Sequence, residues 1–534
     1  MTIDLATLRS LKTEQHVADA KGMDMLSAKD LIKMLHHYQL EAVNAVEGAL
    51  PEIVAVVREA AARLKDKSGR YMGAGAGTSY RLVVQDQIEM ATLNWKKKRM
   101  GYFGAGGKDA LVLSNEGGED DIETPVRLIK DAQLGEHDVF LGVTASGRTP
   151  WVLAGTKQAR QQGAMTVAIV NNEGSALSRE AEYTIYLDTT PEPVGGSTRM
   201  NAGTSQKMTL NLISCGILFE LGHLKPYDLV ELLEDTPSFR PKFKSLEEMQ
   251  TEDFLRCLLE NHAQAIRGVA KSIPTMAKAA KDMADRLVDH EGDLVMGGAG
   301  TTARAAVQEG AELYPTFGFS PKRTHFALLG GKAALTRDFM LVVDQEDAAV
   351  EAAETFDINA KDVCILGSVS GRTRYTKFLA EEAMERGALT IGLSNLPNAD
   401  LFNCVTHGIY LPTGANPMGK LTRYSAGTAH KVTLNMLTTA AMTMMGHVYN
   451  GMMVDVQPFC EKLVVRNRGI VQDITGCSEE EAKALLDATS TRAAGQNATR
   501  AVLLHGGVKA DEWEVFLQKH GNRSNKAIRA LGYE

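Results

Sequence analysis

The stretch Gly75-Ala76-Gly77-Thr78-Ser79 decides the fold, because the chain repeats it about 224 residues later as Gly298-Ala299-Gly300-Thr301-Thr302. Two further motifs return in the same order at nearly the same distance: Ser146-Gly147-Arg148-Thr149 as Ser370-Gly371-Arg372-Thr373, and Ala202-Gly203-Thr204-Ser205-Gln206-Lys207 as Ala426-Gly427-Thr428-Ala429-His430-Lys431. Three motifs that keep both order and spacing predict a duplicated domain. The repeated residues are Gly, Ser, Thr and Lys, which bind phosphate, so the repeat bears on function as well.

The length and composition are those of an ordinary soluble protein with several domains. A chain of 534 residues is too long for one hydrophobic core and suits two or three domains. Its net charge of −8 argues against nucleic acid or an anionic membrane as the main partner. No run approaches the roughly 18 apolar residues of a membrane span. The six cysteines are scattered without metal-ligand spacing, which predicts reduced thiols in a cytoplasmic protein and no bound metal.

Short apolar segments alternate with helical patterns in both halves of the chain. Strands are expected at 70–74, 138–143, 165–170 and 183–187 in the first half, and at 293–296, 339–343, 362–367, 389–393 and 407–411 in the second. Strands that are continuously apolar and separated by helices indicate an α/β fold, in which a parallel sheet is sandwiched by helices. We therefore expect two such sheets in tandem.

The domain boundaries follow from the repeat and from the composition between its copies. We expect five segments: an N-terminal helical lead-in at 1–66, a first domain at 67–224, a linker at 225–254, a helical lead-in and second domain at 255–457, and a small C-terminal helical subdomain at 458–534. The linker contains three prolines and mixed charge. The last segment has no counterpart in the first half.

Two of the motifs have the composition of anion-binding turns. Each lies between an expected strand and an expected helix, where glycine permits a tight turn and free backbone N–H groups point at an anion. Their side chains add hydroxyl and guanidinium donors. This pattern predicts sugar-phosphate contacts from Thr78, Ser79, Ser146, Arg148 and Thr149 in the first half, and from Thr302, Ser370 and Thr373 in the second.

A third polar cluster runs from Gly196 to Lys207 and opens an otherwise apolar helix. We expect its polar side chains to bind the same ligand; they are Ser197, Thr198, Arg199 and Lys207. The recurrence of the lysine as Lys431 favours a site role over a solvated cap. A dinucleotide cofactor is not expected, because Tyr80 stands where a G-x-G-x-x-G fingerprint needs glycine.

The segments GAGTS, ASGRTP and GSTRMNAGTSQK, in this order, resemble the sugar isomerase (SIS) domain, and more narrowly the N-acetylmuramic acid 6-phosphate etherase family. The second half carries the motifs more loosely, and 446–456 and 475–478 then match the family's C-terminal part. Family members are single-domain chains that pair as homodimers. The resemblance therefore implies two tandem SIS domains that form an internal pseudo-dimer, with further homo-oligomers left open.

Two glutamates fall in register with the family's acid and base. One lies ten residues after the Ser of GAGTS, which gives Glu89 and, in the second half, Glu312. The other lies 27 residues before the Ser of SGRT, which gives Glu119. Its nearest counterpart in the second half is Glu346, if a small deletion is assumed. The resemblance implies catalytic duty for Glu89 as acid and Glu119 as base, although the sequence alone assigns neither role.

The resemblance also implies a reaction. The substrate would be an amino-sugar 6-phosphate that carries a lactyl ether at C3, and the ether would be cleaved by elimination and hydration without a metal or an organic cofactor. The main alternative is a regulator resembling the glucokinase regulatory protein, which also has two SIS domains, binds fructose phosphates and inhibits a kinase partner. A sugar-phosphate isomerase is a third reading. The retained glutamates favour the lyase, because a sensor does not need a matched acid and base.

Overall fold

The computed structural model describes residues 4–93, 95–113, 117–224, 249–289, 291–337, 346–414, 423–458, 460–490 and 497–533. It contains two five-stranded sheets, and every strand pairing in them is parallel. This confirms the predicted α/β fold with two parallel sheets.

Both sheets have the same strand order. The first runs β2-β1-β3-β4-β5, with bounds β1 Tyr71–Gly75, β2 Met100–Gly104, β3 Val139–Val143, β4 Met165–Val170 and β5 Tyr183–Tyr186. The second runs β7-β6-β8-β9-β10, with bounds β6 Leu294–Gly298, β7 Thr324–Leu328, β8 Val363–Gly367, β9 Leu389–Ser394 and β10 His407–Tyr410. The equal order shows that the repeated motifs sit in equivalent places in the two halves.

Two strands were missing from the sequence prediction, β2 and β7. Both are edge strands and both are only partly buried. An edge strand does not need the continuous apolar run that identifies a central strand of a parallel sheet. The expected strand at 339–343 lies outside the described residues.

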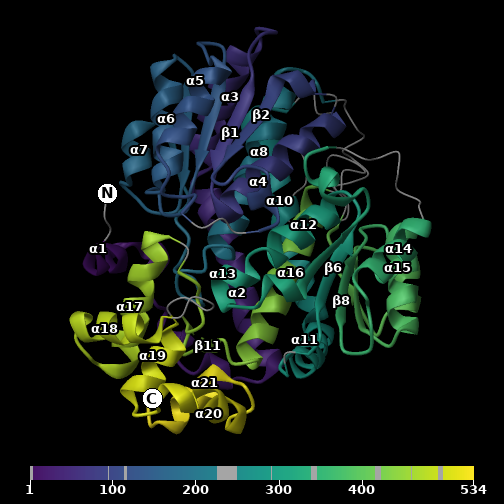
Figure 1. The fold of residues 1–534 in the computed structure, drawn as a ribbon. Coiled ribbons are helices and arrows are strands. Elements are labelled where there is room, and N and C mark those ends of the chain that lie inside the picture. The colour runs from purple at the N-terminus through teal and green to yellow at the C-terminus, as the bar shows by residue number, and fades with distance from the viewer. Residues whose placement is uncertain are drawn as a thin grey trace.

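Helices cover both faces of each sheet (Figure 1). Helices α5 (Glu123–Ala132), α6 (Pro150–Gln161) and α7 (Ala176–Glu180) lie on the outer face of the first sheet, and α14 (Asp347–Thr355) and α15 (Arg374–Glu385) lie on that of the second. The inner face of the first sheet contacts α3 (Leu50–Leu64) and α4 (Gly77–Met90), and that of the second contacts α11 (Ile273–Leu287) and α12 (Thr301–Gly310). Two long, buried helices, α8 (Asn201–Glu220) and α16 (Ser425–Met444), pack against these helices. The lead-in helices α2 (Ala28–Gly48), α3, α10 (Thr251–Val269) and α11 pack around α8 and α16.

One hydrophobic core runs through both halves. It includes buried residues of α2, α8, α10 and α16, and α2 contacts both α8 of its own half and α16 of the other. Ser27 caps α2 by accepting a hydrogen bond from the Asp30 amide at 3.2 Å. The shared core holds the two sheets in a fixed relation.

The C-terminal region is a helical subdomain, as predicted. After the short hairpin of β11 (Val448–Tyr449) and β12 (Met452–Met453), it contains α17 (Glu461–Thr475), α18 (Glu479–Thr489), α19 (Ala498–His505), α20 (Trp513–Lys519) and α21 (Ser524–Ala530). The N-terminal helix α1 (Leu5–Ser10) packs on α17 through a small apolar cluster of Leu5, Leu8, Leu11 and Val465. Figure 1 shows α1 beside α17 of this subdomain.

The described ranges hold neither a helix that could span a membrane nor a cluster of metal ligands. None of their helices has the length and apolarity needed to cross a bilayer. Nor do these ranges bring three or more His, Cys, Asp or Glu side chains together as metal ligands. The domain boundaries proposed from the sequence stay predictions.

Candidate active site

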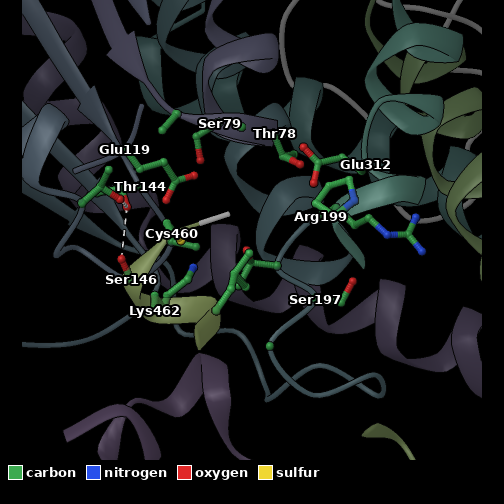
Figure 2. Close-up of a pocket in the computed structure, with 18 of the residues that line it drawn as sticks. Thr78, Ser79, Glu119, Thr144, Ser146, Ser197, Arg199, Glu312, Cys460 and Lys462 are labelled. Atoms are coloured by element: carbon green, nitrogen blue, oxygen red, sulfur yellow. Dashed lines mark hydrogen bonds between the residues drawn. The ribbon is translucent and has the colours of Figure 1, made fainter. Parts of the chain in front are cut away.

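A pocket opens at the carboxyl ends of β1 and β3, between the first half, the second half and the C-terminal subdomain (Figure 2). Helices α4 (Gly77–Met90) and α6 begin at this edge, so their first backbone N–H groups face the pocket region. The polar side chains that line it are Thr78, Ser79, Arg81, Glu119, Thr144, Ser146, Thr149, Ser197, Thr198, Arg199, Glu312, Thr316, Lys462 and Arg466.

Hydroxyl groups gather at the two helix starts. The Ser79 hydroxyl donates to Oε1 of Gln206 at 2.8 Å. The hydroxyls of Thr144 and Thr149 lie 2.7 Å apart, and those of Thr144 and Ser146 lie 3.3 Å apart. Hydroxyls held by neighbouring hydroxyls and amides can turn toward a ligand without being left unsatisfied. This cluster has the donors and the geometry for a phosphate group.

Two carboxyl groups flank the turn at Gly77. A Cβ atom built on Gly77, whose φ is +51°, would lie 3.6 Å from Oε1 of Glu312 and 3.7 Å from Oε1 of Glu119. Figure 2 shows the two carboxyl groups at opposite sides of the Thr78–Ser79 turn. Because both oxygens lie within 4 Å of the same point beside Gly77, a single small ligand in the pocket can contact both.

Glu89 is not a member of this pocket. It accepts a hydrogen bond from the Thr301 hydroxyl at 2.7 Å, and its Oε1 lies 3.5 Å from Nη1 of Arg304. Both partners belong to the start of α12 (Thr301–Gly310) in the second half. The structure therefore does not bring Glu89 and Glu119 together: the pocket contains Glu312 in place of Glu89.

The presence of Glu312 in the pocket in place of Glu89 has a simple geometric cause. Helices α4 and α12 pack against each other across the two halves, so that the end of each lies beside the start of the other. Arg81 at the start of α4 forms an ion pair with Glu312 just beyond α12, and Arg304 at the start of α12 pairs with Glu89 at the end of α4. Each half thus supplies a glutamate to the other half's motifs.

The electrostatic surroundings of the two pocket glutamates differ. Burial raises the pKa of Glu119, and the nearby carboxyl groups of Glu312 and Asp120 add to the rise, while Lys462 and Arg466 oppose it. Glu312 contacts the Arg81 guanidinium, which is itself fixed by bonds of 2.8 Å to the carbonyls of Ala110 and Leu111. The two carboxyl groups therefore lie in different electrostatic environments, which a reaction that uses one of them as acid and the other as base requires.

Lys207 and Lys431 do not reach the ligand side of the fold. Nζ of Lys207 donates to the carbonyl of Arg423 at 2.9 Å, and Nζ of Lys431 donates to the carbonyl of Arg199 at 2.8 Å. Both side chains are buried, and each satisfies the loop that precedes the other half's long helix. The recurrence of the lysine, which suggested a phosphate contact, reflects reciprocal hydrogen bonds between the two halves.

The two predicted arginines differ in their placement. Arg199 lines the pocket, but its guanidinium forms a buried ion pair with Glu309 and donates to the Thr439 hydroxyl at 2.5 Å. The second half has the reciprocal pair, with Nη1 of Arg423 lying 3.8 Å from Oδ1 of Asp86. Arg148 is exposed and is not among the pocket residues.

The third cluster also contributes hydroxyls. Ser197 and Thr198 line the pocket as expected. The Ser197 hydroxyl is buried and has no hydrogen-bond partner in the described part of the chain. A buried hydroxyl without a partner is costly unless a ligand or water satisfies it, so the Ser197 hydroxyl is available to a molecule in the pocket.

Besides Leu463, the C-terminal subdomain supplies three polar pocket residues that the sequence did not reveal: Cys460, Lys462 and Arg466. The last two lie one turn apart on α17, so they point to the same side of that helix. Charged residues on a helix far from any motif usually form a solvated face, so no signal in the sequence identified them.

Comparison with known proteins places this site in a family. Residues 52–159 match the model of the glucokinase regulatory protein N-terminal SIS domain, and residues 129–215 match the SIS domain model. An N-acetylmuramic acid 6-phosphate etherase of Deinococcus radiodurans is 34% identical over 306 residues, which are 57% of this chain and 97% of that protein. The chain belongs to the N-acetylmuramic acid 6-phosphate etherase family.

Other members of the etherase family give the same result. The etherase of Clostridium beijerinckii is 37% identical over 226 residues, which are 42% of this chain and 74% of the relative. Among solved structures, the C-terminal domain of glucosamine-fructose-6-phosphate aminotransferase from Francisella tularensis matches with a TM-score of 0.48 and 12% identity, covering 76% of this chain and 96% of that one.

The second copy of the etherase motifs is built differently. The Thr302 hydroxyl donates to the carbonyl of Gly367 at 2.8 Å, and Ser370 is exposed. The Thr373 hydroxyl lies 2.9 Å from that of Ser368, as Thr149 does beside Thr144 in the first half. Glu346 is partly exposed and forms an ion pair with Arg374, which stands where the first copy has Pro150. The carboxylate is thus already neutralised by its own half.

Proposed function

We propose that this protein cleaves the lactyl ether of N-acetylmuramic acid 6-phosphate, or of a closely related amino-sugar 6-phosphate, in the pocket described above. The single observation that carries the proposal is the pair of carboxyl groups, Glu119 and Glu312, on the two sides of the Gly77 turn. Cleavage by elimination needs an acid and a base within reach of adjacent carbon atoms. Membership of the etherase family supports the same reaction.

The phosphate group would bind at the starts of α4 and α6. Ser79, Ser146 and Thr149 offer hydroxyl donors there, and the helix N-termini add backbone N–H groups and a favourable dipole. Lys462 supplies a positive charge from α17. Binding energy from the phosphate then orients C2 and C3 of the sugar between the glutamates.

The elimination step uses the glutamates in opposite protonation states. In the ring-opened aldehyde the C2 proton is acidic, and a carboxylate removes it. The electron pair forms the C2–C3 double bond, the C3–O bond breaks, and the lactate oxygen takes a proton from the second carboxyl group. Water then adds its hydroxyl to C3 while C2 regains a proton, which yields the amino-sugar 6-phosphate and lactate.

We assign Glu119 as the base and Glu312 as the acid. The raised pKa of Glu119 makes its carboxylate a stronger base. Arg81 stabilises the carboxylate that Glu312 becomes after it has given up its proton. The family resemblance places the acid at the position shared by Glu89 and Glu312, and in this pocket Glu312 occupies it.

We further propose that the two halves stand in for the two subunits of a homodimeric relative. The reciprocal pairs Arg81–Glu312 and Arg304–Glu89 support this, because each half completes the other's site. We also keep the cytoplasmic location as a proposal. It rests on the six cysteines, which form no disulfide.

The test is to incubate the protein with N-acetylmuramic acid 6-phosphate in isotopically labelled water. We expect release of unlabelled lactate and a sugar phosphate that carries the solvent oxygen at C3. Label in the lactate would indicate displacement at the lactyl carbon and would contradict elimination. Tight binding of the sugar phosphate without any lactate would overturn the enzymatic proposal.

That last outcome would favour a second candidate function, a regulator that binds a sugar phosphate. The match of residues 52–159 to the N-terminal SIS domain of the glucokinase regulatory protein favours it, and a kinase would then be the natural partner. Such a sensor needs the hydroxyls of the pocket but gains nothing from two facing carboxyl groups, so we rank it below the etherase.

A further inference from the structure

The N-terminal segment lies against the pocket wall, far in sequence from every motif. Its turn η1 (Lys12–Glu14) reaches α17, where Glu14 binds Arg466 through both carboxylate oxygens. Oε2 accepts from Nε at 2.9 Å and Oε1 from Nη2 at 2.7 Å. The side chains of Glu14 and Arg466 are only 4% and 9% exposed, so this is a buried bidentate pair.

The same turn is fixed to the first sheet. The Asn172 amide donates to the Thr13 hydroxyl at 2.9 Å and to the carbonyl of Ala145 at 2.9 Å. Ala145 lines the pocket and directly precedes Ser146. The turn therefore has one rigid connection to the phosphate-side loop and another to α17.

Arg466 in turn fits closely against the loop of Ser197. A Cβ atom on Gly196, whose φ is +77°, would lie 2.7 Å from Cζ of Arg466, so only glycine leaves room for the guanidinium. Both Gly196 and Arg466 line the pocket. The place of the guanidinium thus sets how closely α17, and Lys462 with it, approaches the ligand.

We propose that Glu14 is a positioning residue of the pocket: it holds Arg466 against Gly196 and thereby fixes α17 over the bound sugar phosphate. The proposal deepens the proposed function and rests on it for the identity of the ligand. A buried guanidinium needs a counter-charge. Without Glu14, the acids left near Arg466 include the catalytic Glu119, so the guanidinium would turn toward the reacting group.

The test compares Glu14→Gln, which keeps the shape but removes the charge, with Asp473→Asn. Asp473 pairs with Arg9 at 2.5 Å and so ties the same N-terminal segment to the same helix, but at the protein surface. We expect Glu14→Gln to weaken binding of N-acetylglucosamine 6-phosphate, measured by calorimetry, roughly tenfold to a hundredfold. KM for the ether substrate should rise more than kcat falls, and Asp473→Asn should leave both unchanged.

A double-variant cycle separates positioning from simple loss of structure. If Glu14 acts through Arg466, adding Glu14→Gln to Arg466→Gln should weaken binding no further than Arg466→Gln alone. Additive losses, unchanged binding in Glu14→Gln, or an equal loss in Asp473→Asn would each overturn the proposal. Because the calorimetric probe is not turned over, these results hold even if no lactate is released and the etherase proposal fails.

Discussion

Ser146 and Ser370 occupy equivalent places in the two repeats, but only Ser146 lines the pocket. We expect Ser146→Ala to raise KM for the sugar phosphate roughly tenfold to a hundredfold, because a hydrogen bond to a charged group contributes about 1.5–3 kcal/mol. Ser370→Ala, the matched control on an exposed residue, should leave KM within about twofold. Steady-state kinetics of both variants checks this, and equal effects would contradict the assignment of the site to the first half.

The sequence predicted the location of a side chain best where the local backbone alone determines it. Thr78, Ser79, Ser146 and Thr149 stand at strand-to-helix turns, where the local chain alone directs a side chain toward the sheet edge. Lys207 gave no such local signal. A polar residue in an apolar helix can face a ligand or a buried carbonyl, and only the packing of the other half decides between them.

At the scale of the element, a lysine connects each long helix to the other half. Lys207 of α8 donates to the loop before α16, and Lys431 of α16 donates to the loop before α8. We expect Lys431→Met to lower the free energy of unfolding by roughly 3 kcal/mol, because buried carbonyl and hydroxyl groups lose their donor. The KM of the Lys431→Met variant for the sugar phosphate should stay near that of the unsubstituted protein. Denaturant unfolding and kinetics measure the two quantities.

Lys361 provides the matched control for that substitution. It forms an exposed pair with Glu291, so Lys361→Met should leave the free energy of unfolding nearly unchanged. A large rise in KM for Lys431→Met without loss of stability would instead indicate that Lys431 contacts the ligand.

Central strands and long helices were predictable because their burial leaves a continuous pattern in the sequence. Strand β3 and helix α8 are buried along almost their whole length. The edge strand β2 and the pocket residues of α17 carry no such pattern, since one is half-exposed and the other depends on a tertiary contact. The features that the sequence did not reveal therefore depend on contacts between residues that are far apart in the chain.

At the scale of the whole molecule, the repeat predicted two equal sheets but not how they share residues. The register of Glu89, Glu119 and Glu312 was readable from the sequence, whereas their grouping was not. Because α4 and α12 run side by side in opposite directions, Glu89 at the end of α4 and Glu312 just beyond α12 each meet the motifs of the other half. The pocket thus has Glu119 from the first half and Glu312 from the second.

The measurement that tests this account most directly is lactate release by Glu312→Gln compared with Glu89→Gln. Both replace the same position of the repeat, and the fold of each variant is checked by thermal unfolding. We predict that Glu312→Gln lowers kcat at least about a hundredfold, as loss of an acid or base does, while Glu89→Gln keeps kcat within about threefold. Loss of activity in Glu89→Gln with activity retained in Glu312→Gln would contradict the shared site.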